Sequence, residues 1–358
     1  MVGNIGIGIA NAIGFKHINK GGGNISYPGL IAAWSAKGKS NDDEDRAILK
    51  DLTGNGHDIT LNGFAFSKGS GYGKYEVDFT TDFREQDKNT LTITKNIVKN
   101  TPKYKGGWLM MRKTYNTPSF KVLLTGLSND GGYVSYGYKK DKDSSWSEFR
   151  LKNNEINVLP AHISDEVGQG FIYHYGKEGY REITLELIPE YPDALVFDGV
   201  DDYGINENMP ILTDYTVIVK RIIMKNARGA VISKSYTVNQ GSFIFEFTTG
   251  HQTYSFGNIN YISIYDKNIS WQNIDSYNQK QILVGEGIDG NDIYIGKIRK
   301  SHPEELNMAF YSAYLFDRSL DEQEIKAFIR KYIDPEYLLP SEPYLVLNQG
   351  KLNINKLK

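Results

Sequence analysis

The chain has 358 residues, a formal net charge of −2 and no cysteine, and its acidic and basic residues are interspersed. This composition excludes a disulfide framework and a thiolate metal cluster, and it argues against electrostatic binding to nucleic acid or to an anionic membrane. The 25 tyrosines, 16 phenylalanines and 36 glycines favour half-buried strands joined by tight turns, and they predict an all-β protein.

Residues 1–23 form an apolar segment interrupted by glycine. The first positive residue is Lys16, and the segment is too short for a transmembrane helix and a poor signal peptide. Exposed isoleucines are a liability in water, so we expect an assembly or attachment arm that becomes ordered on a partner. A flexible terminal tail is the alternative. The isoleucines concerned are Ile5, Ile7, Ile9 and Ile13.

Residues 24–193 carry two groups of strand signals. An apolar run around Trp34 and the alternating run "ITLNGFAF" flank the glycine turn "DLTGNGHD". Residues 67–193 then hold six further strand runs, parted by Gly, Asn, Asp and Pro clusters, and this segment is long enough for a small β domain. The six runs are "GGWLMMRKTY", "SFKVLLTGL", "GGYVSYGYKK", "SEFRLKNN", "GFIYHYG" and "REITLELIP".

Residues 194–333 begin with a series of strand candidates, from "ALVFDG" to "NMAFYSAYLFD", and end in a helix. The stretch "SLDEQEIKAFIRKYI" places its apolar residues on one helical face, and Ser319 with Glu322 three residues later predicts a capping box. This is the single helix that the sequence predicts. Residues 334–358 are a polar C-terminal tail.

Several of these stretches, in this order, resemble the laminin-G-like jelly rolls of the concanavalin A-like lectin architecture. The stretches are "LIAAWSA", "KDLTGNGHDITLNGFAF", "ALVFDGVDDYG", "YTVIVKRI", "GAVISK" and "AFYSAYLFDRSLDEQEIKAF". In that family the second and third stretches are joined by a short connection, whereas here 127 residues (194 − 66 − 1) separate Phe66 from Ala194. The resemblance therefore implies one jelly-roll sandwich from residues 24–66 and 194–333, with residues 67–193 as an inserted β domain.

The stretch "NDDEDRAILKDLTGNGHDITLNGFAF" also resembles modules in virion proteins of tailed, crAss-like bacteriophages of gut bacteria. This resemblance implies a non-enzymatic virion structural protein, namely a head fibre, a decoration protein or a tail-associated protein. Such a protein is made in the host cytoplasm and then located in the virion. Its expected partners are other virion proteins, further copies of itself (a trimer, for example) and a host surface glycan, without membrane insertion.

Two acidic turns raise the question of a calcium site. Asp51, Asn55 and Asp58 lie on one turn, and Asp198 lies on another together with Asp201 and Asp202. Calcium prefers carboxylate, amide and carbonyl oxygens, and a jelly roll could bring the two turns together. We therefore consider Asp51, Asn55, Asp58 and Asp198 as Ca²⁺ ligands. Turn geometry alone also explains these residue types, and the absence of a full calcium-loop motif favours that alternative.

Aromatic residues are the candidates for glycan binding, because sugar rings stack on aromatic faces. We predict that Tyr136, Tyr138, Trp146 and Trp271 bind carbohydrate, although such residues also pack as cross-strand pairs or at subunit interfaces. A carbohydrate-binding lectin is the main alternative function. A polysaccharide depolymerase is a further one, but the paired carboxylates of related glucanases are absent, and we predict that the protein is not an enzyme.

Overall fold

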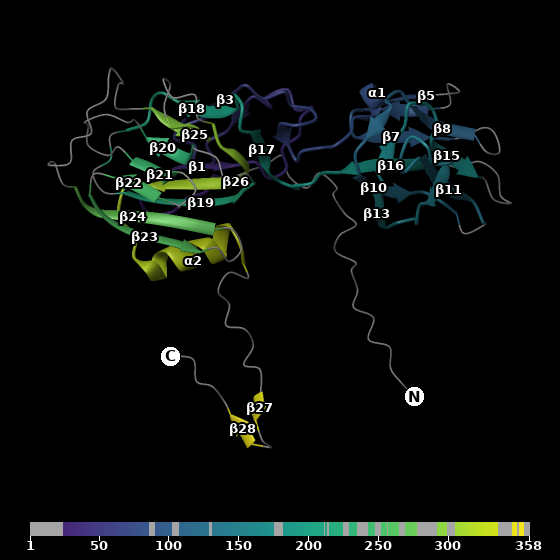
Figure 1. Cartoon of the computed structure of the whole chain (residues 1–358). Coiled ribbons are helices and arrows are strands. Elements are labelled where there is room, and N and C mark those ends of the chain that lie inside the picture. Colours follow the sequence, from purple (N-terminus) through teal and green to yellow (C-terminus); the bar gives the residue numbers. More distant parts are fainter. Residues whose placement is uncertain are drawn as a thin grey trace.

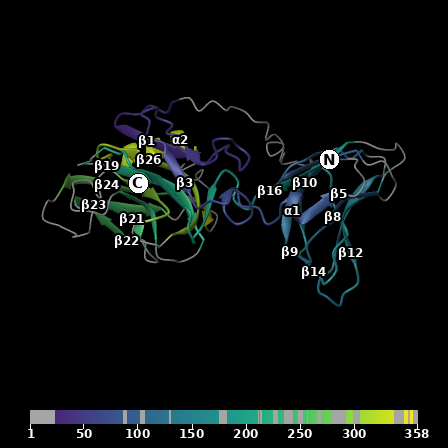
Figure 2. The same cartoon turned by 90° about the horizontal axis from the view of Figure 1, so that it is seen from above.

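The computed structural model describes residues 24–85, 90–101, 107–128, 131–174, 182–210, 212, 215–224, 229–234, 243–247, 252–255, 257–264, 269–277, 292–298, 305–335, 346–348 and 351–353. These residues form many strands and two helices, which confirms the all-β prediction. The chain builds two β bodies, one much larger than the other (Figures 1 and 2). The predicted arm, with Ile5, Ile7, Ile9 and Ile13, lies outside the described residues.

The larger body, here called the first sandwich, contains two seven-stranded sheets. The first sheet has the order β23-β24-β19-β26-β17-β4, and β1 also pairs with β26. Every pairing in it is antiparallel. Its strands are β1 (Leu30–Ser35), β4 (Gly71–Tyr72), β17 (Leu195–Asp198), β19 (Tyr215–Ile223), β23 (Gly257–Ile264), β24 (Ile269–Tyr277) and β26 (Asn307–Phe316).

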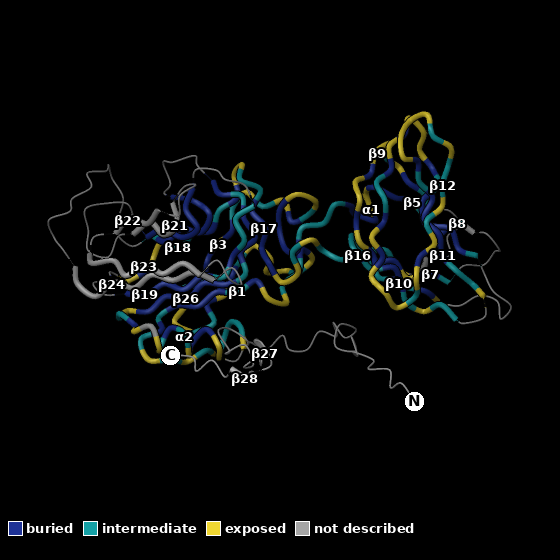
Figure 3. Tube along the Cα trace, turned by 60° about the horizontal axis from the view of Figure 1, so that its bottom comes forward, coloured by how far each residue is buried: buried dark blue, intermediate teal, exposed yellow. Residues whose placement is uncertain are grey.

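The second sheet of the first sandwich has the order β2-β3-β18-β25-β20-β21-β22. Side chains alternate along its strands, so every second one points toward the first sheet. Leu61 and Ile295 of the second sheet thus lie with Val217 and Leu315 of the first sheet in one buried cluster. Figure 3 shows these buried segments as the interior of the body. The strands are β2 (Ile48–Leu49), β3 (Ile59–Asn62), β18 (Tyr203–Asn206), β20 (Ala230–Lys234), β21 (Phe243–Phe247), β22 (Gln252–Ser255) and β25 (Ile293–Ile295).

Two separate strands share one edge of the long strand β26. Residues Leu30 to Ser35 of β1 pair with Phe316 to Ser312, and β17 pairs with the other half of the same edge, from Phe310 to Asn307. The short strand β4 then pairs with β17, so residues 71–72 belong to the first sandwich. The predicted start of the inserted domain, residue 67, is therefore too early. The chain therefore passes to the smaller body after Tyr72.

Helix α2 (Glu322–Tyr332) covers the outer side of the first sheet, where Phe328 and Ile329 pack against Ile218 and Tyr314. The predicted capping box at Ser319 and Glu322 is wrong by two residues. Asp321 caps the helix: its Oδ1 accepts from the Glu324 backbone N–H at 2.8 Å, and Glu324 Oε2 accepts from the Asp321 N–H at 3.1 Å. A second, four-residue helix, α1 (Phe79–Asp82), was not predicted.

The smaller body, here called the second sandwich, contains two five-stranded sheets with one shared core, which includes Val122, Leu185, Val134 and Phe171. The sheet order β13-β10-β16-β7-β6 uses β6 (Thr90–Ile93), β7 (Ile97–Asn100), β10 (Phe120–Thr125), β13 (Ile156–Leu159) and β16 (Ile183–Ile188). The order β12-β11-β15-β8-β5 uses β5 (Phe83–Glu85), β8 (Gly107–Arg112), β11 (Tyr133–Tyr138), β12 (Ser147–Arg150) and β15 (Gly170–His174). All six predicted strand runs of this segment are present.

Two small ladders lie outside these sheets. Strand β9 (Asn116–Thr117) pairs with β14 (His162–Ile163), and β27 (Val346–Asn348) pairs with β28 (Lys351–Asn353) in the C-terminal tail. Among the described residues, neither helix is long and apolar enough to cross a membrane.

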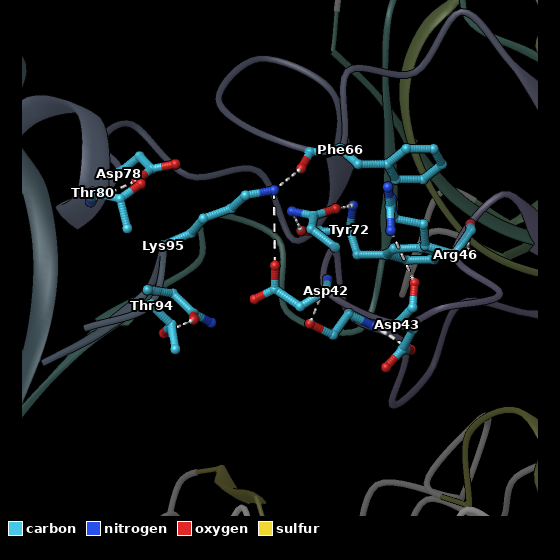
Figure 4. Close-up of polar contacts among 12 residues, drawn as sticks. Asp42, Asp43, Arg46, Phe66, Tyr72, Asp78, Thr80, Thr94 and Lys95 are labelled. Carbon is cyan, nitrogen blue, oxygen red and sulfur yellow. Dashed lines mark hydrogen bonds and ion pairs between the residues drawn. The ribbon is translucent and has the colours of Figure 1, made fainter. Parts of the chain in front are cut away.

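Polar side chains link the two bodies. Figure 4 shows Lys95, from the turn between β6 and β7, reaching toward the first sandwich. Its Nζ donates to the Phe66 carbonyl at 3.3 Å and lies 3.7 Å from Asp42 Oδ1. Nearby, Lys68 Nζ is 2.7 Å from Asp82 Oδ1 of α1. The pocket at this junction has a volume of about 20 Å³, which is enough for a water molecule and too small for an organic ligand.

Candidate functional site

The first of the two acidic turns is held together by Asp51. Its carboxylate accepts from the backbone N–H groups of Ala33 (3.1 Å), Thr53 (3.0 Å) and His57 (3.1 Å), and from the Thr53 hydroxyl (2.8 Å). Asp51 is buried, and donors occupy both of its oxygens. A cation would have to displace these donors, so Asp51 organises the turn and fastens it to β1.

Asp58 and Asn55 have similar roles in this turn. Asp58 accepts from the Asp51 backbone N–H at 2.8 Å and from Lys50 Nζ at 2.7 Å, while the Asn55 side-chain amide donates to the Ile31 carbonyl at 2.9 Å. The structure therefore does not bring the predicted metal set of Asp51, Asn55, Asp58 and Asp198 together in one group. The first three serve turn geometry, and Asp198 belongs to a different cluster.

That cluster lies where the chain crosses from the first sheet to the second. Asp198 is the last residue of β17, and Asp201 and Asp202 directly precede β18. One carboxylate oxygen from each of the three lies within 4.8 Å of the others. Asp201 is exposed, Asp198 is half-buried and Asp202 is fully buried.

The turn is tightly seated against the end of β3. A Cβ atom on Gly63, which has a φ of 84°, would lie 2.2 Å from the Asp201 carbonyl oxygen, so only glycine allows this approach. Asp202 Oδ2 accepts from the Asp198 backbone N–H at 2.8 Å, and the Ser70 side chain is a second hydrogen-bond partner of this buried carboxylate. Burial raises the pKa of Asp202 to about 7, and the charge and side chain of Asp198 add to this rise, while hydrogen bonds from the Asp198 N–H and the Ser70 side chain partly offset it.

A polar groove of about 380 Å³ lies on the outer face of the second sheet. This volume is within the range of about 300–1,000 Å³ that is typical of small-ligand sites. Residues of β3, β18 and β25 form it, and the ladder pair Tyr203 and Asn62 places it directly beside the acidic cluster. Its lining residues are Asp58, Thr60, Asn62, Tyr203, Ile205, Asn206, Glu207, Asn208 and Tyr294.

The groove offers a mixture of fixed and accessible groups. Asn206 is held by its side-chain donation to the Asp58 carbonyl at 2.7 Å, and its own Oδ1 accepts from the Asn208 N–H at 2.8 Å. Glu207 and Asn208 are exposed, and Tyr203 is half-buried with Lys297 Nζ 4.4 Å from its ring centroid. Tyr294 is fully buried beneath them. The accessible groups are therefore amides, carboxylates, the Thr60 hydroxyl and one tyrosine.

The aromatic residues predicted to bind carbohydrate are not gathered in one place. Tyr136 is a correction: it is fully buried in the second sandwich, with the Arg112 guanidinium 4.9 Å from its ring centroid, so neither ring face can reach a sugar. Tyr138 is half-buried and stacks on Tyr136. Trp146 is half-buried and stacks on His162, with 5.3 Å between ring centroids. Trp271 lies in β24, where only the backbone is described.

Sequence reasoning missed the groove residues Asn62, Tyr203 and Asn208. Their signals were present but weak, since "ITLN" alternates and "DYGIN" follows the acidic turn. These residues come together because β3 pairs with β18. In the sequence, the whole second sandwich lies between these two strands.

Comparisons with family models, with curated proteins and with solved structures gave no match to this chain.

Proposed function

We propose that this chain is a non-enzymatic structural protein of a tailed-phage virion, and that its first sandwich is a laminin-G-like jelly roll that binds a surface glycan. The observation that carries the adhesive role is the polar groove across β3, β18 and β25. The virion assignment is supported by the sequence resemblance in the acidic loop and the turn that follows it.

A glycan suits the groove better than an apolar ligand. Sugar hydroxyls both donate and accept hydrogen bonds, and the exposed amide of Asn208 and carboxylate of Glu207 offer both kinds of partner. Tyr203 adds an aromatic ring for the C–H face of a sugar. The junction pocket, by contrast, has room for a water molecule alone.

Replacing Tyr203 by alanine should weaken glycan binding about tenfold, which corresponds to a loss of roughly 1.4 kcal/mol of contact energy. Binding is measured by glycan array and calorimetry on a panel of purified capsular polysaccharides and O-antigens. Asn208→Ala removes an exposed groove side chain without removing the backbone bond to Asn206, and should also weaken binding. Tyr115→Ala is the matched control, because Tyr115 is 56% exposed on the second sandwich. Wild-type affinity in both groove variants would contradict the proposal.

The virion role predicts self-assembly through residues 1–23. Light scattering should give a discrete homo-oligomer, such as a trimer, for the full chain and a monomer for a chain that begins at Asn24. The physical reason is that the four isoleucines of the arm gain a buried partner in the assembly. The same number of subunits per particle for both chains would contradict assembly through the arm.

A further inference from the structure

Strand β13 is an edge strand of the second sandwich that lacks the usual protection against further pairing. It ends the sheet order β13-β10-β16-β7-β6, and β10 is its one partner among the described strands. The strand reads "INVL" and holds neither a charge nor a proline. Ile156 and Val158 are 55% and 58% exposed, and no other strand with described side chains has two exposed large apolar residues. An edge of this kind is a template for an added strand.

The edges of the facing sheet differ from β13 in their charge. At the two ends of the order β12-β11-β15-β8-β5, β12 carries Glu148 and Arg150, and β5 carries Arg84 and Glu85. Charged side chains on an edge strand oppose pairing with a further strand, because that pairing would remove them from water. The lack of charge on β13 therefore leaves its edge open to an apolar partner.

The position of β13 is fixed by hydrogen bonds of its own segment. Asn157 is buried, and its Oδ1 accepts from the Lys152 backbone N–H at 2.8 Å. The Nδ2 of the same side chain donates to the Glu155 carbonyl at 2.8 Å. These bonds hold the loop through which the chain enters β13. A preformed edge lowers the ordering cost of binding a partner.

The exposed face of β13 continues onto the neighbouring strands. Ile156 pairs with Leu123 of β10, and Val158 pairs with Lys121, which in turn pairs with Ile188 of β16. Leu123 and Ile188 are half-buried on the outer face of this sheet. A strand added beside β13 would therefore place its apolar side chains next to Ile156 and Val158 and extend this outer face.

Residues 5–9 of the arm have the matching pattern. Ile5, Ile7 and Ile9 alternate with glycine, so in a strand the isoleucines share one face and the other face has no side chains. No charged residue precedes Lys16. Five residues in a strand span about 17 Å, which is enough to cover the four residues of β13. Glycine weakens a strand, so this segment needs a partner to become ordered.

We infer that residues 5–9 of a second copy add to the sheet edge at β13, with their isoleucines on the same face as Ile156 and Val158. The inference rests on the proposed assembly through residues 1–23, and it identifies the surface that receives the arm. Backbone hydrogen bonds of the added strand provide affinity, and the apolar cross-strand pairs set its register.

The arm is connected to the first sandwich by a long enough segment to reach another copy. Residues 10–23 number 14 (23 − 10 + 1) and span at most about 46–50 Å when extended. They lead to Asn24, beside which the Ile25 N–H donates to the Leu52 carbonyl at 2.8 Å. The arm and the β13 edge are different surfaces, so the contact repeats head to tail. Such a contact closes into a ring, for example a trimer.

Paired cysteines in the full chain test the contact directly, because the chain has no cysteine of its own. Ile5→Cys, Ile7→Cys and Ile9→Cys are each combined with Val158→Cys, and the chains are oxidised. Cross-strand neighbours lie within disulfide reach, so at least one pair should give covalent multimers on a gel run without reductant.

The controls for this test are Gly6→Cys with Val158→Cys and Ile7→Cys with Val200→Cys. Gly6 lies on the opposite face of the added strand, and Val200 is 72% exposed on the first sandwich, so neither pair should crosslink. Equal crosslinking of Gly6→Cys, or a disulfide that forms within one chain, would overturn the inference.

Light scattering on the full chain provides an independent readout. Val158→Lys should weaken assembly at least about tenfold, because the added strand would remove the new charge from water. Val200→Lys is the matched control and should assemble like the wild type. Both positions are exposed, so both variants are expected to fold.

The outcomes separate this inference from the proposed assembly. Wild-type assembly in Val158→Lys, while the chain that begins at Asn24 is a monomer, would overturn the β13 site and leave assembly through the arm intact. A monomeric full chain would overturn both.

Discussion

Replacing Trp34 by alanine is expected to lower the free energy of unfolding of the first sandwich by about 4–5 kcal/mol. Trp34 is fully buried in the core between the two seven-stranded sheets. Its indole Nε1 also donates to the His57 carbonyl at 2.6 Å, so the substitution creates a cavity and leaves a carbonyl without its partner. A loss of this size is a large part of the stability of an ordinary domain.

Calorimetry of the full chain measures this effect. The two sandwiches have separate cores, so we expect them to unfold in separate transitions, of which Trp34→Ala shifts one. Trp146→Ala is the matched control, because Trp146 is half-buried in the second sandwich and should affect the other transition alone. A loss below about 2 kcal/mol for Trp34→Ala would show that the core tolerates the cavity.

Replacing Asp51 by alanine should cost about 3–4 kcal/mol, because the backbone N–H groups of Ala33, Thr53 and His57 lose their shared acceptor. Asp51→Asn should cost less, since its amide oxygen can still accept some of these donors. Denaturant unfolding of both variants, in EDTA and in excess Ca²⁺, is the measurement.

The comparison between EDTA and calcium decides between turn geometry and metal binding at Asp51. We expect the same loss of stability in both conditions. Asn55→Ala is the control on the same turn, and should cost less than about 1 kcal/mol because Asn55 is exposed and contributes one hydrogen bond, to the Ile31 carbonyl. A loss in Asp51→Ala that appears only with Ca²⁺ present would restore the metal assignment.

The strand content could be predicted because apolar alternation and glycine turns are local signals. Runs such as "SFKVLLTGL" and "REITLELIP" became β10 and β16. The helix start could not be placed to the residue, because Ser319 and Asp321 both have glutamate three positions later. What distinguishes the two residues is which side chain accepts a hydrogen bond from the helix backbone. That depends on how the preceding strand ends.

The site was harder to predict because it depends on contacts between distant segments. Alternation shows that Tyr136 and Tyr138 share a strand face, but it does not show which face is covered by a second sheet. Likewise, the sequence "FDGVDDYG" presents three aspartates that look alike in the sequence. That Asp202 alone of the three is buried is seen only in the fold, where this turn is seated against β3.

The shared edge of β26 constrains how this chain can be synthesised and folded. Ser35 of β1 contacts Tyr311, 276 residues further along the chain, so β1 lacks its partner β26 until the ribosome has passed residue 311. The strands of the second sandwich lie in one contiguous stretch, and that body can close long before. The nascent strand β1 must therefore wait for its partner while a finished β body already separates the two in the chain.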